Sequence, residues 1–332
     1  MVNFFDVFLT VFFLLLLAVP GFLFAKLKMF PKNASETISV IVLYGCQPIL
    51  IITSFQACAF HPEIGINLLI TAGIALLVHL LMFALVKILF YKWANEEKTK
   101  LVKYLSVFSN CGFMGLPFLQ SLFTDASLQS ELVIYCAVVL AVFNVLNWTF
   151  GVYILTGEKK EISAKKVLLN PVIIAVAISL ILFFVMQKPL VEIAPVGSVG
   201  YKILTKLMNS LNFLSNMVTP LSMFVIGVRL ANVDIKALVT NKWAYASTAT
   251  KLIVMSLLTT FLVAFLPIAN TIKYTVFFLL SMPSATSSAM MAVQYGKDSD
   301  FASIGVVLST ICSIATLPLL YLFMNSVLGV AL

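Results

Sequence analysis

The chain has 332 residues, of which 61% are hydrophobic and 10% are charged, and its formal net charge is +8. Soluble domains carry about 25% charged residues, so this composition excludes a soluble domain and indicates an integral membrane protein in a lipid bilayer. The positive charges lie in short segments between apolar spans, where membrane topology explains them, and no arginine-rich cluster suggests a nucleic-acid site.

Ten apolar segments are long enough to cross a bilayer, for which a helix needs about 20 residues. They lie at 3–25, 36–57, 66–91, 103–123, 130–155, 167–186, 203–230, 243–266, 272–295 and 301–328. The first segment lacks the basic region and cleavage site of a signal peptide, so we expect it to be retained. The sequence therefore predicts an all-α integral membrane protein with ten transmembrane helices and short links.

The basic residues concentrate in alternate links. Most of the 21 lysine and arginine residues lie in or beside the links after spans one, three, five, seven and nine. Lys188, Lys202, Lys206 and Lys273 lie in the other links, and Lys251 lies within span eight. The positive-inside rule then places the odd-numbered links in the cytoplasm. We expect a multi-pass protein of the plasma membrane with both termini extracytoplasmic.

Spans four and nine are interrupted by residues that disfavour a helix. The first interruption runs from Asn110 to Pro117 and contains two glycines, and the second lies near Ser281–Ser284, around Pro283. Proline removes a backbone donor, and each glycine costs a helix about 1 kcal/mol relative to alanine. Within hydrocarbon, such breaks are tolerated only where protein or a polar cavity satisfies the backbone. The alternative is a kinked helix packed through small residues.

The two halves of the chain share this pattern. Pro48 in span two corresponds to Pro220 in span seven, and Pro117 in span four corresponds to Pro283 in span nine, at nearly equal separations. Five spans per half is an odd number, so the second half is inserted in the opposite orientation. The sequence predicts two inverted repeats, residues 1–158 and 159–332, an arrangement typical of secondary transporters.

Paired breaks predict an anion site that needs no charged side chain. Each second half-helix begins inside the membrane, where its free N–H groups carry about half a positive charge. An amide and several hydroxyls, including that of Thr286, add hydrogen-bond donors. The predicted substrate-binding residues are Asn110, Cys111, Gly112, Gly115, Pro117, Pro283, Ser284, Ser287 and Ser288.

Other polar residues within the spans are predicted to support this site. Gln47 precedes the proline of span two, and Asn144 and Asn147 share a helix face from which they could bond the unwound backbone. Lys251 could attract an anionic substrate, pair with a carboxylate or replace a coupling cation, and structural pairing or snorkelling is the alternative. His79 is interpreted as a neutral packing residue rather than a titrating one.

No metal, disulfide or cofactor site is expected. The five cysteines lie mostly within apolar spans, no CxxC motif occurs, and the chain has two histidines. Motifs of metalloproteases, α/β-hydrolases and P-loop enzymes are also missing, so the sequence predicts a protein that is not an enzyme.

Several motifs resemble the auxin efflux carrier family, whose bacterial members are described as malate or malonate permeases and whose plant members export auxin. The resemblance covers nearly the whole chain. It rests on Leu43–Pro48, Asn110–Pro117, Asn170–Ile173, Thr219–Leu221 with Gly227, Pro283, Gln294–Gly296 and Thr316–Pro318. Asn110 stands where the family places an asparagine at the crossing of helices four and nine.

The resemblance implies a fold similar to those of bile-acid sodium symporters and sodium/proton antiporters. Helices one, two, six and seven would form a dimerising scaffold. Helices three to five and eight to ten would form a moving transport domain, in which the breaks of helices four and nine cross. The implied mechanism is elevator-type alternating access.

The sequence thus predicts a secondary transporter of small organic anions, with malate-like carboxylates favoured, that acts as a homodimer. A sodium- or proton-coupled symporter of bile-acid type is one alternative. No pair of carboxylates lies within the spans to build a sodium site, and span three lacks the acidic residue that some plant relatives use. A membrane sensor of an organic anion is the other alternative, and the short links offer it no output domain.

Overall fold

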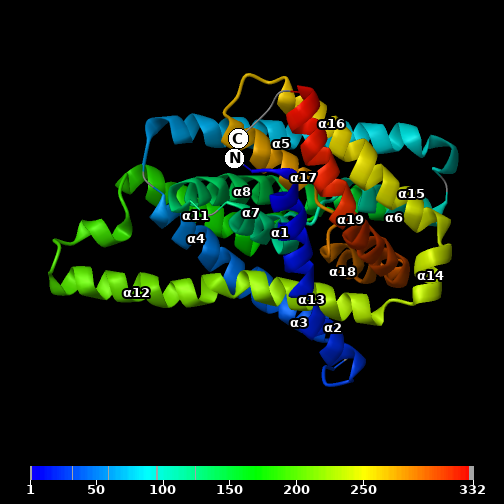
Figure 1. Ribbon diagram of the computed structural model, residues 1–332, viewed down its shortest axis with the longest axis horizontal. Coiled ribbons are helices and arrows are strands. Elements are labelled where there is room, and N and C mark those ends of the chain that lie inside the picture. The colour runs from blue at the N-terminus through cyan, green and yellow to red at the C-terminus, as the bar shows by residue number, and fades with distance from the viewer. Residues whose placement is uncertain (1, 32, 59, 95, 124, 329–332) are drawn as a thin grey trace.

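The structure is a computed structural model, and it confirms the all-α class (Figure 1). The residues that it describes are 2–31, 33–58, 60–94, 96–123 and 125–328. Within these ranges the chain is helical, and the only extended pairing is an isolated bridge between Ser109 and Ser284.

The helices follow one another with short connections. The helices before residue 170 are α1 (Phe4–Leu16), α2 (Val19–Lys26), α3 (Ala34–Val40), α4 (Gln47–Ala57), α5 (Pro62–Leu89), α6 (Glu97–Val107), α7 (Leu116–Leu122), α8 (Ala126–Leu146), α9 (Val152–Thr156) and α10 (Ala164–Leu168). The later helices are α11 (Pro171–Met186), α12 (Val199–Asn216), α13 (Val218–Asn232), α14 (Ile235–Thr240), α15 (Lys242–Ala249), α16 (Ser256–Ala264), α17 (Asn270–Ser281), α18 (Ser287–Gln294) and α19 (Ser299–Leu328). Short π-helical turns join α3 to α4, α8 to α9 and α15 to α16.

Eight helical segments of the described chain are long and apolar enough to cross a membrane, so the protein is a multi-pass membrane protein. They are Phe4–Lys26, Ala34–Ala57, Pro62–Leu89, Leu128–Thr156, Pro171–Ile193, Val199–Asn232, Lys242–Ala264 and Ser299–Ser326. The remaining two predicted spans, four and nine, are present as pairs of shorter helices, α6 with α7 and α17 with α18. The inverted repeat stays a prediction.

The break in span four lies earlier than the sequence suggests. The backbone is extended at Phe108, and the helix resumes at Cys111 through a π-helical turn, Cys111–Gly115, that leads into α7. Pro117 therefore lies at the start of α7. A proline is tolerated there because its missing N–H and fixed φ suit the first turn of a helix. The predicted unwinding at Pro117 is thus wrong.

The two breaks lie in the core. Every residue from Tyr104 to Leu119 is buried except Gly112, which is half-buried, and every residue from Tyr274 to Thr286 is buried. In Figure 1 α7 and α17 lie in the middle of the molecule, α6 and α18 lie to their right, and the long pair α12 and α13 runs below them. Because protein surrounds them, the unwound segments find hydrogen-bond partners within the fold.

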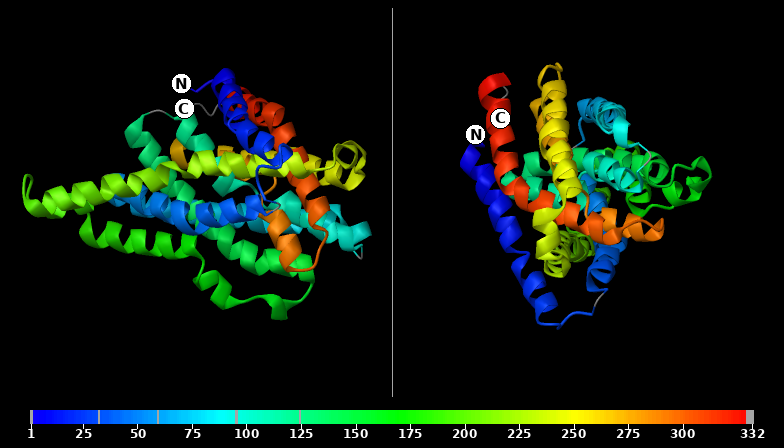
Figure 2. Two further views of the ribbon diagram at one scale, coloured as in Figure 1. Left: turned by 90° about the horizontal axis from the view of Figure 1, so that it is seen from below. Right: turned by 90° about the vertical axis from the view of Figure 1, so that its right-hand side faces the viewer.

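A close crossing of α2 and α13 explains two glycines. A Cβ atom on Gly227 would lie 2.0 Å from the carbonyl oxygen of Ala18, and one on Gly21 would lie 2.5 Å from that of Phe224. Only glycine lets the two backbones approach this closely. The crossing is visible in Figures 1 and 2, where α13 passes over the N-terminal helices.

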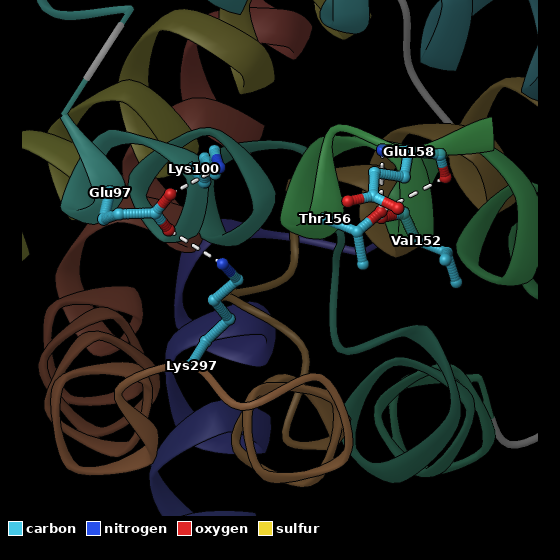
Figure 3. Close-up of polar contacts among 6 residues, drawn as sticks. All are labelled: Glu97, Lys100, Val152, Thr156, Glu158 and Lys297. Carbon is cyan, nitrogen blue, oxygen red and sulfur yellow. Dashed lines mark hydrogen bonds and ion pairs between the residues drawn. The ribbon is translucent and has the colours of Figure 1, made fainter. Parts of the chain in front are cut away.

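An ion-pair cluster connects the two broken spans at one face of the molecule. The Glu97 carboxylate at the start of α6 lies 2.5 Å from the Lys100 ammonium and 2.7 Å from that of Lys297, which follows α18 (Figure 3). These hydrogen bonds lower the pKa of Glu97 from 4.5 to about 2. Figure 3 also shows Glu158, whose N–H donates to Thr156 at the end of α9 over 3.1 Å.

Candidate functional site

The extended segments of the two breaks cross and pair in antiparallel orientation. The N–H of Asn110 donates to the carbonyl of Pro283 over 2.8 Å, and the N–H of Ala285 donates to the carbonyl of Phe108 over 2.9 Å. This exchange satisfies backbone groups that unwinding would otherwise leave unpaired in hydrocarbon. It fixes the two second half-helices so that both begin at the crossing.

Two serines reinforce the crossing symmetrically. The Ser109 hydroxyl donates to the carbonyl of Leu280 over 2.9 Å, and the Ser284 hydroxyl donates to the carbonyl of Leu105 over 2.8 Å. Each acceptor lies one helical turn before the other serine, so each hydroxyl caps the end of the opposite helix. At the crossing Ser109 therefore corresponds to Ser284, whereas the sequence comparison had matched Pro283 to Pro117.

Lys251 also caps the C-terminal end of α17, the helix end that Ser109 caps. It lies in the π-helical turn Thr250–Met255 and is fully buried, and its ammonium donates to the Ser109 hydroxyl and, over 2.8 Å, to the carbonyl of Leu280. Cations are favoured at helix C-termini because the free carbonyls carry partial negative charge. Among the described residues, Lys251 forms no ion pair with a carboxylate.

A cavity of about 70 Å³ lies beside the crossing. It is lined by Leu43, Tyr44, Gln47, Ser109, Asn110, Gly112, Phe113, Leu140, Phe143, Asn144, Asn147, Trp148, Asn170, Pro171, Val172, Ala285, Thr286, Ser287 and Met290. The starts of both second half-helices thus line one cavity. The described lining residues carry no acidic side chain.

Two amide groups of this cavity have unused donors. The Nδ2 atom of Asn110 and the Nε2 atom of Gln47 are buried and have no partner among the described residues. Thr286 donates to the Asn110 Oδ1 atom over 3.4 Å, which leaves Nδ2 as the free end of the amide. A buried donor without a partner costs about 1–3 kcal/mol, so these two nitrogens favour a ligand that supplies acceptors.

Backbone donors add to these amides at the helix starts. No described residue accepts a hydrogen bond from the N–H groups of Gly112, Phe113 or Ser287. A Cβ atom on Gly112 would lie 2.9 Å from the Gln47 Nε2 atom, so glycine is what allows the amide to come this close. First-turn N–H groups together with amide nitrogens form an environment suited to anionic oxygens.

The side chains of the span-five asparagines form hydrogen bonds with other residues than those of the unwound backbone. Asn144 accepts a hydrogen bond from the Asn170 amide over 2.9 Å, and Asn147 accepts one from the Tyr104 hydroxyl. The expected bonds to the unwound backbone are replaced because the two extended segments bond each other. Asn170 also caps α11, with its Oδ1 atom 2.9 Å from the N–H of Val172.

A cation lies next to the cavity. The Lys166 ammonium lies 5.5 Å from the ring centroid of Trp148 and 5.4 Å from that of Tyr295, and it donates to the Tyr295 hydroxyl over 3.4 Å. Trp148 also lines the cavity. The two aromatic rings hold the exposed ammonium through cation–π attraction. Nothing in the sequence predicts this cluster, because its members come from three separate spans and links.

The predicted site residues fall into two groups. Those that line the cavity are Asn110, Gly112, Ser287, Gln47, Asn144 and Asn147. Those outside its lining are Cys111, Gly115, Pro117, Pro283, Ser284, Ser288 and Lys251. Most of the second group build the crossing: the Cys111 thiol donates to the carbonyl of Leu279 over 3.3 Å, for example. Tyr44, Asn170 and Trp148 also line the cavity but were not predicted as site residues; Tyr44 and Asn170 lie in motifs that carry the family resemblance, whereas nothing in the sequence marks Trp148.

His79 is fully buried in α5. Its Nδ1 atom donates to the carbonyl of Ala75 over 2.7 Å, and its Nε2 atom has no partner in the described part of the chain. The ring lies 6.4 Å from that of Phe108. These contacts suit the packing role that the sequence predicts. Within the described ranges, no group of three or more His, Cys, Asp or Glu residues is placed to hold a metal ion.

Comparison with known proteins adds one finding. A family model described as a membrane transport protein matches residues 6–167 and 158–321 of the chain. The matched ranges contain every residue that lines the cavity. A search of curated proteins found no match.

Proposed function

The chain belongs to the auxin efflux carrier family of membrane transport proteins, and we propose that it is a secondary transporter of small organic anions. It is a membrane transporter by family, and this agrees with the absence of enzyme motifs in the sequence. The substrate, the mechanism and the plasma-membrane location are the parts proposed.

The observation that carries the proposal is the donor-rich, uncharged cavity at the crossing. The free amide nitrogens of Asn110 and Gln47 and the starts of two half-helices line it, and the described lining includes no carboxylate. Such a site stabilises a carboxylate through oriented donors and helix dipoles. It offers a cation no acidic ligand.

Malate-like carboxylates are the class that we propose. The cavity of about 70 Å³ is smaller than the roughly 300–1,000 Å³ that is typical of small-molecule sites, so in this conformation it restricts the ligand to a small one. Its donors lie on two separate half-helices, near Asn110 and Ser287, so one ligand with two carboxylates can engage both. Lys166 beside Trp148 adds a positive charge that attracts anions toward the cavity.

The elevator mechanism is supported by how the contacts are distributed. Helices α1–α4 and α11–α13 form the proposed scaffold, and the remaining helices form the proposed transport domain. The crossing bonds and the Lys297–Glu97 pair lie within the transport domain and tie its parts together. The cavity is shared, because Gln47 and Asn170 belong to the scaffold and Asn110 and Thr286 to the transport domain.

Uptake by proteoliposomes tests the substrate. We expect labelled malate and related small carboxylates to accumulate inside vesicles that contain the protein, with unlabelled acids competing. Replacement of Asn110 by Ala (Asn110→Ala) should lower apparent affinity by about tenfold or more, since hydrogen bonds to a charged group contribute about 1.5–3 kcal/mol. Asn212→Ala, at an exposed position of α12, serves as the matched control. Equal affinity in wild type and Asn110→Ala would move the site elsewhere.

Lys251 favours sodium-independent transport over a sodium symporter. Its ammonium already bonds a backbone carbonyl and a hydroxyl, which are the oxygen ligands that a sodium ion would use. We therefore expect uptake to be equal in sodium and potassium buffers. A strict sodium requirement would instead favour the bile-acid type of symport.

A further inference from the structure

A second polar cavity lies away from the crossing and shares no lining residue with the first. It has a volume of about 390 Å³ and lies where α3, α13, α14 and α19 meet. Its polar lining comprises Ser35, Glu36, Arg229, Asn232, Asp234, Asp300 and Ser303. Small-molecule sites have volumes of about 300–1,000 Å³, so this cavity is large enough for one small ligand or headgroup.

The lining of this cavity includes a buried charge with an unused hydrogen-bond donor. Arg229, the one arginine of the chain, lies in the last turn of α13 and is only 7% exposed. Among the described residues its Nε atom has no hydrogen-bond partner and no carboxylate lies within ion-pair distance of its guanidinium, although Glu36 attracts it electrostatically from the same lining. The C-terminus of α13 attracts this cation but does not supply acceptors for its donors. A buried guanidinium with an unused donor favours binding of an anionic group that can accept a hydrogen bond from it.

The rim of the cavity carries the opposite charge. Glu36 lies in the first turn of α3, Asp300 lies in the first turn of α19, and Asp234 caps α14 through the N–H of Lys236 over 2.9 Å. All three carboxylates are exposed, whereas the guanidinium is buried. They suit the positive ends of their helices, and they also repel a ligand that carries only negative charge.

We propose that this cavity binds a zwitterion: a carboxylate or phosphate group reaches Arg229, and an ammonium group lies among the rim carboxylates. A purely anionic ligand would meet three carboxylates, and a purely cationic one would meet the buried guanidinium. Free amino acids and phosphoethanolamine headgroups share this chemistry. The cavity lies at the end of a membrane-spanning segment, Val199–Asn232, so both water-soluble and lipid sources can reach it. The proposal does not depend on the substrate of the first cavity.

Thermal unfolding of the purified full-length protein provides the test. In detergent we expect O-phosphoethanolamine or glycine to raise the unfolding midpoint saturably, with inorganic phosphate and choline much weaker. In nanodiscs we expect phosphatidylethanolamine to raise the midpoint above phosphatidylcholine if the source is lipid. Arg229→Gln should weaken binding by about tenfold or more, and Lys242→Gln, outside the cavity, should not. No stabilisation by any zwitterion in either setting, or equal stabilisation of Arg229→Gln, overturns the proposal.

A second variant tests the charge pattern while the buried arginine stays in place. Asp300 is exposed, so Asp300→Asn should leave the fold intact. It removes one rim carboxylate, and we expect about fivefold weaker binding of O-phosphoethanolamine together with tighter binding of inorganic phosphate. Opposite changes for the two probes support a zwitterion site. Unchanged binding of both probes, or parallel changes, would contradict it.

Discussion

Two residues at the crossing shape the cavity: Gly112 leaves space for a neighbouring amide, and Asn110 leaves one hydrogen-bond donor unused. Gly112 has no side chain, and this allows the Gln47 amide to reach the helix start. Asn110 uses its oxygen for Thr286 and keeps its nitrogen for the cavity. The sequence marks Asn110 and Gly112 as unusual within an apolar span. It does not reveal Gln47 as their partner, because Gln47 lies in another span.

Gly112→Ala should weaken substrate binding. The added Cβ atom would lie 2.9 Å from the Gln47 Nε2 atom, so the amide must withdraw from the cavity. We expect the apparent affinity for malate to fall by about tenfold, equivalent to one lost hydrogen bond to a charged group. Uptake kinetics measure this change. Gly73→Ala is the control, since no atom lies within 4 Å of its added Cβ. The same affinity in both variants would argue against the Gln47 contact.

Lys251→Met should destabilise the crossing of the two broken spans. The variant keeps an apolar side chain but removes the donor to the Leu280 carbonyl and the Ser109 hydroxyl, both of which are buried. The Leu280 carbonyl keeps the Ser109 hydroxyl as a donor, so the expected loss is that of hydrogen bonds from a charged group, each of which contributes about 1.5–3 kcal/mol. A lower midpoint of thermal unfolding is expected, with Lys236→Met, at an exposed position, unchanged. An unaltered midpoint for Lys251→Met would show that the capping contact contributes little.

At the scale of elements, the two broken spans form one unit. The first half-helix of each span, α6 or α17, ends at the crossing, where a carbonyl near its end accepts a hydrogen bond from a serine of the other span. The sequence predicts that both spans break. It misplaces the first break, because Gly115 and Pro117 look more disruptive than Phe108 and Ser109. Long-range pairing between extended backbones decided the position.

The paired serines should both stabilise the crossing, although only Ser109 also accepts a hydrogen bond from Lys251. Ser109→Ala and Ser284→Ala each remove a buried hydroxyl that caps the opposite helix, and each should cost about 1 kcal/mol of stability. Their effects should be non-additive in a double-mutant cycle, because the two serines face each other across the bridge. Ser210→Ala, whose exposed hydroxyl bonds its own helix over 2.9 Å, provides the control. Full additivity would indicate two independent caps.

At the scale of the whole molecule, one exposed cluster joins segments far apart in the chain. Glu97 and Lys297 are 200 residues apart and connect α6 to the segment after α18 (Figure 3). The two broken spans are therefore connected in two places, by the backbone bonds of the crossing in the core and by this ion pair at the surface. These contacts agree with the proposal that the two broken spans move together.

The Glu97 cluster should make stability depend on pH at the acidic end. The folded pKa of Glu97, about 2, lies below the usual 4.5. Its contribution is therefore fully present above about pH 4.5 and is lost as the pH falls toward 2. Wild type should lose more stability than Glu97→Gln over that window. The difference should shrink at high salt, because the carboxylate is exposed and screened. Parallel pH profiles for the two proteins would rule out this contribution.

The sequence by itself determined the membrane class, the apolar spans and the two spans that break. These properties depend on composition and on local backbone preferences, which a chain carries before it folds. Only the tertiary structure decided the register of the crossing, the partners of Lys251, and the meeting of Gln47, Asn110 and Asn170 around one cavity. Such contacts join residues from different spans, and they depend on how the helices pack rather than on any one segment.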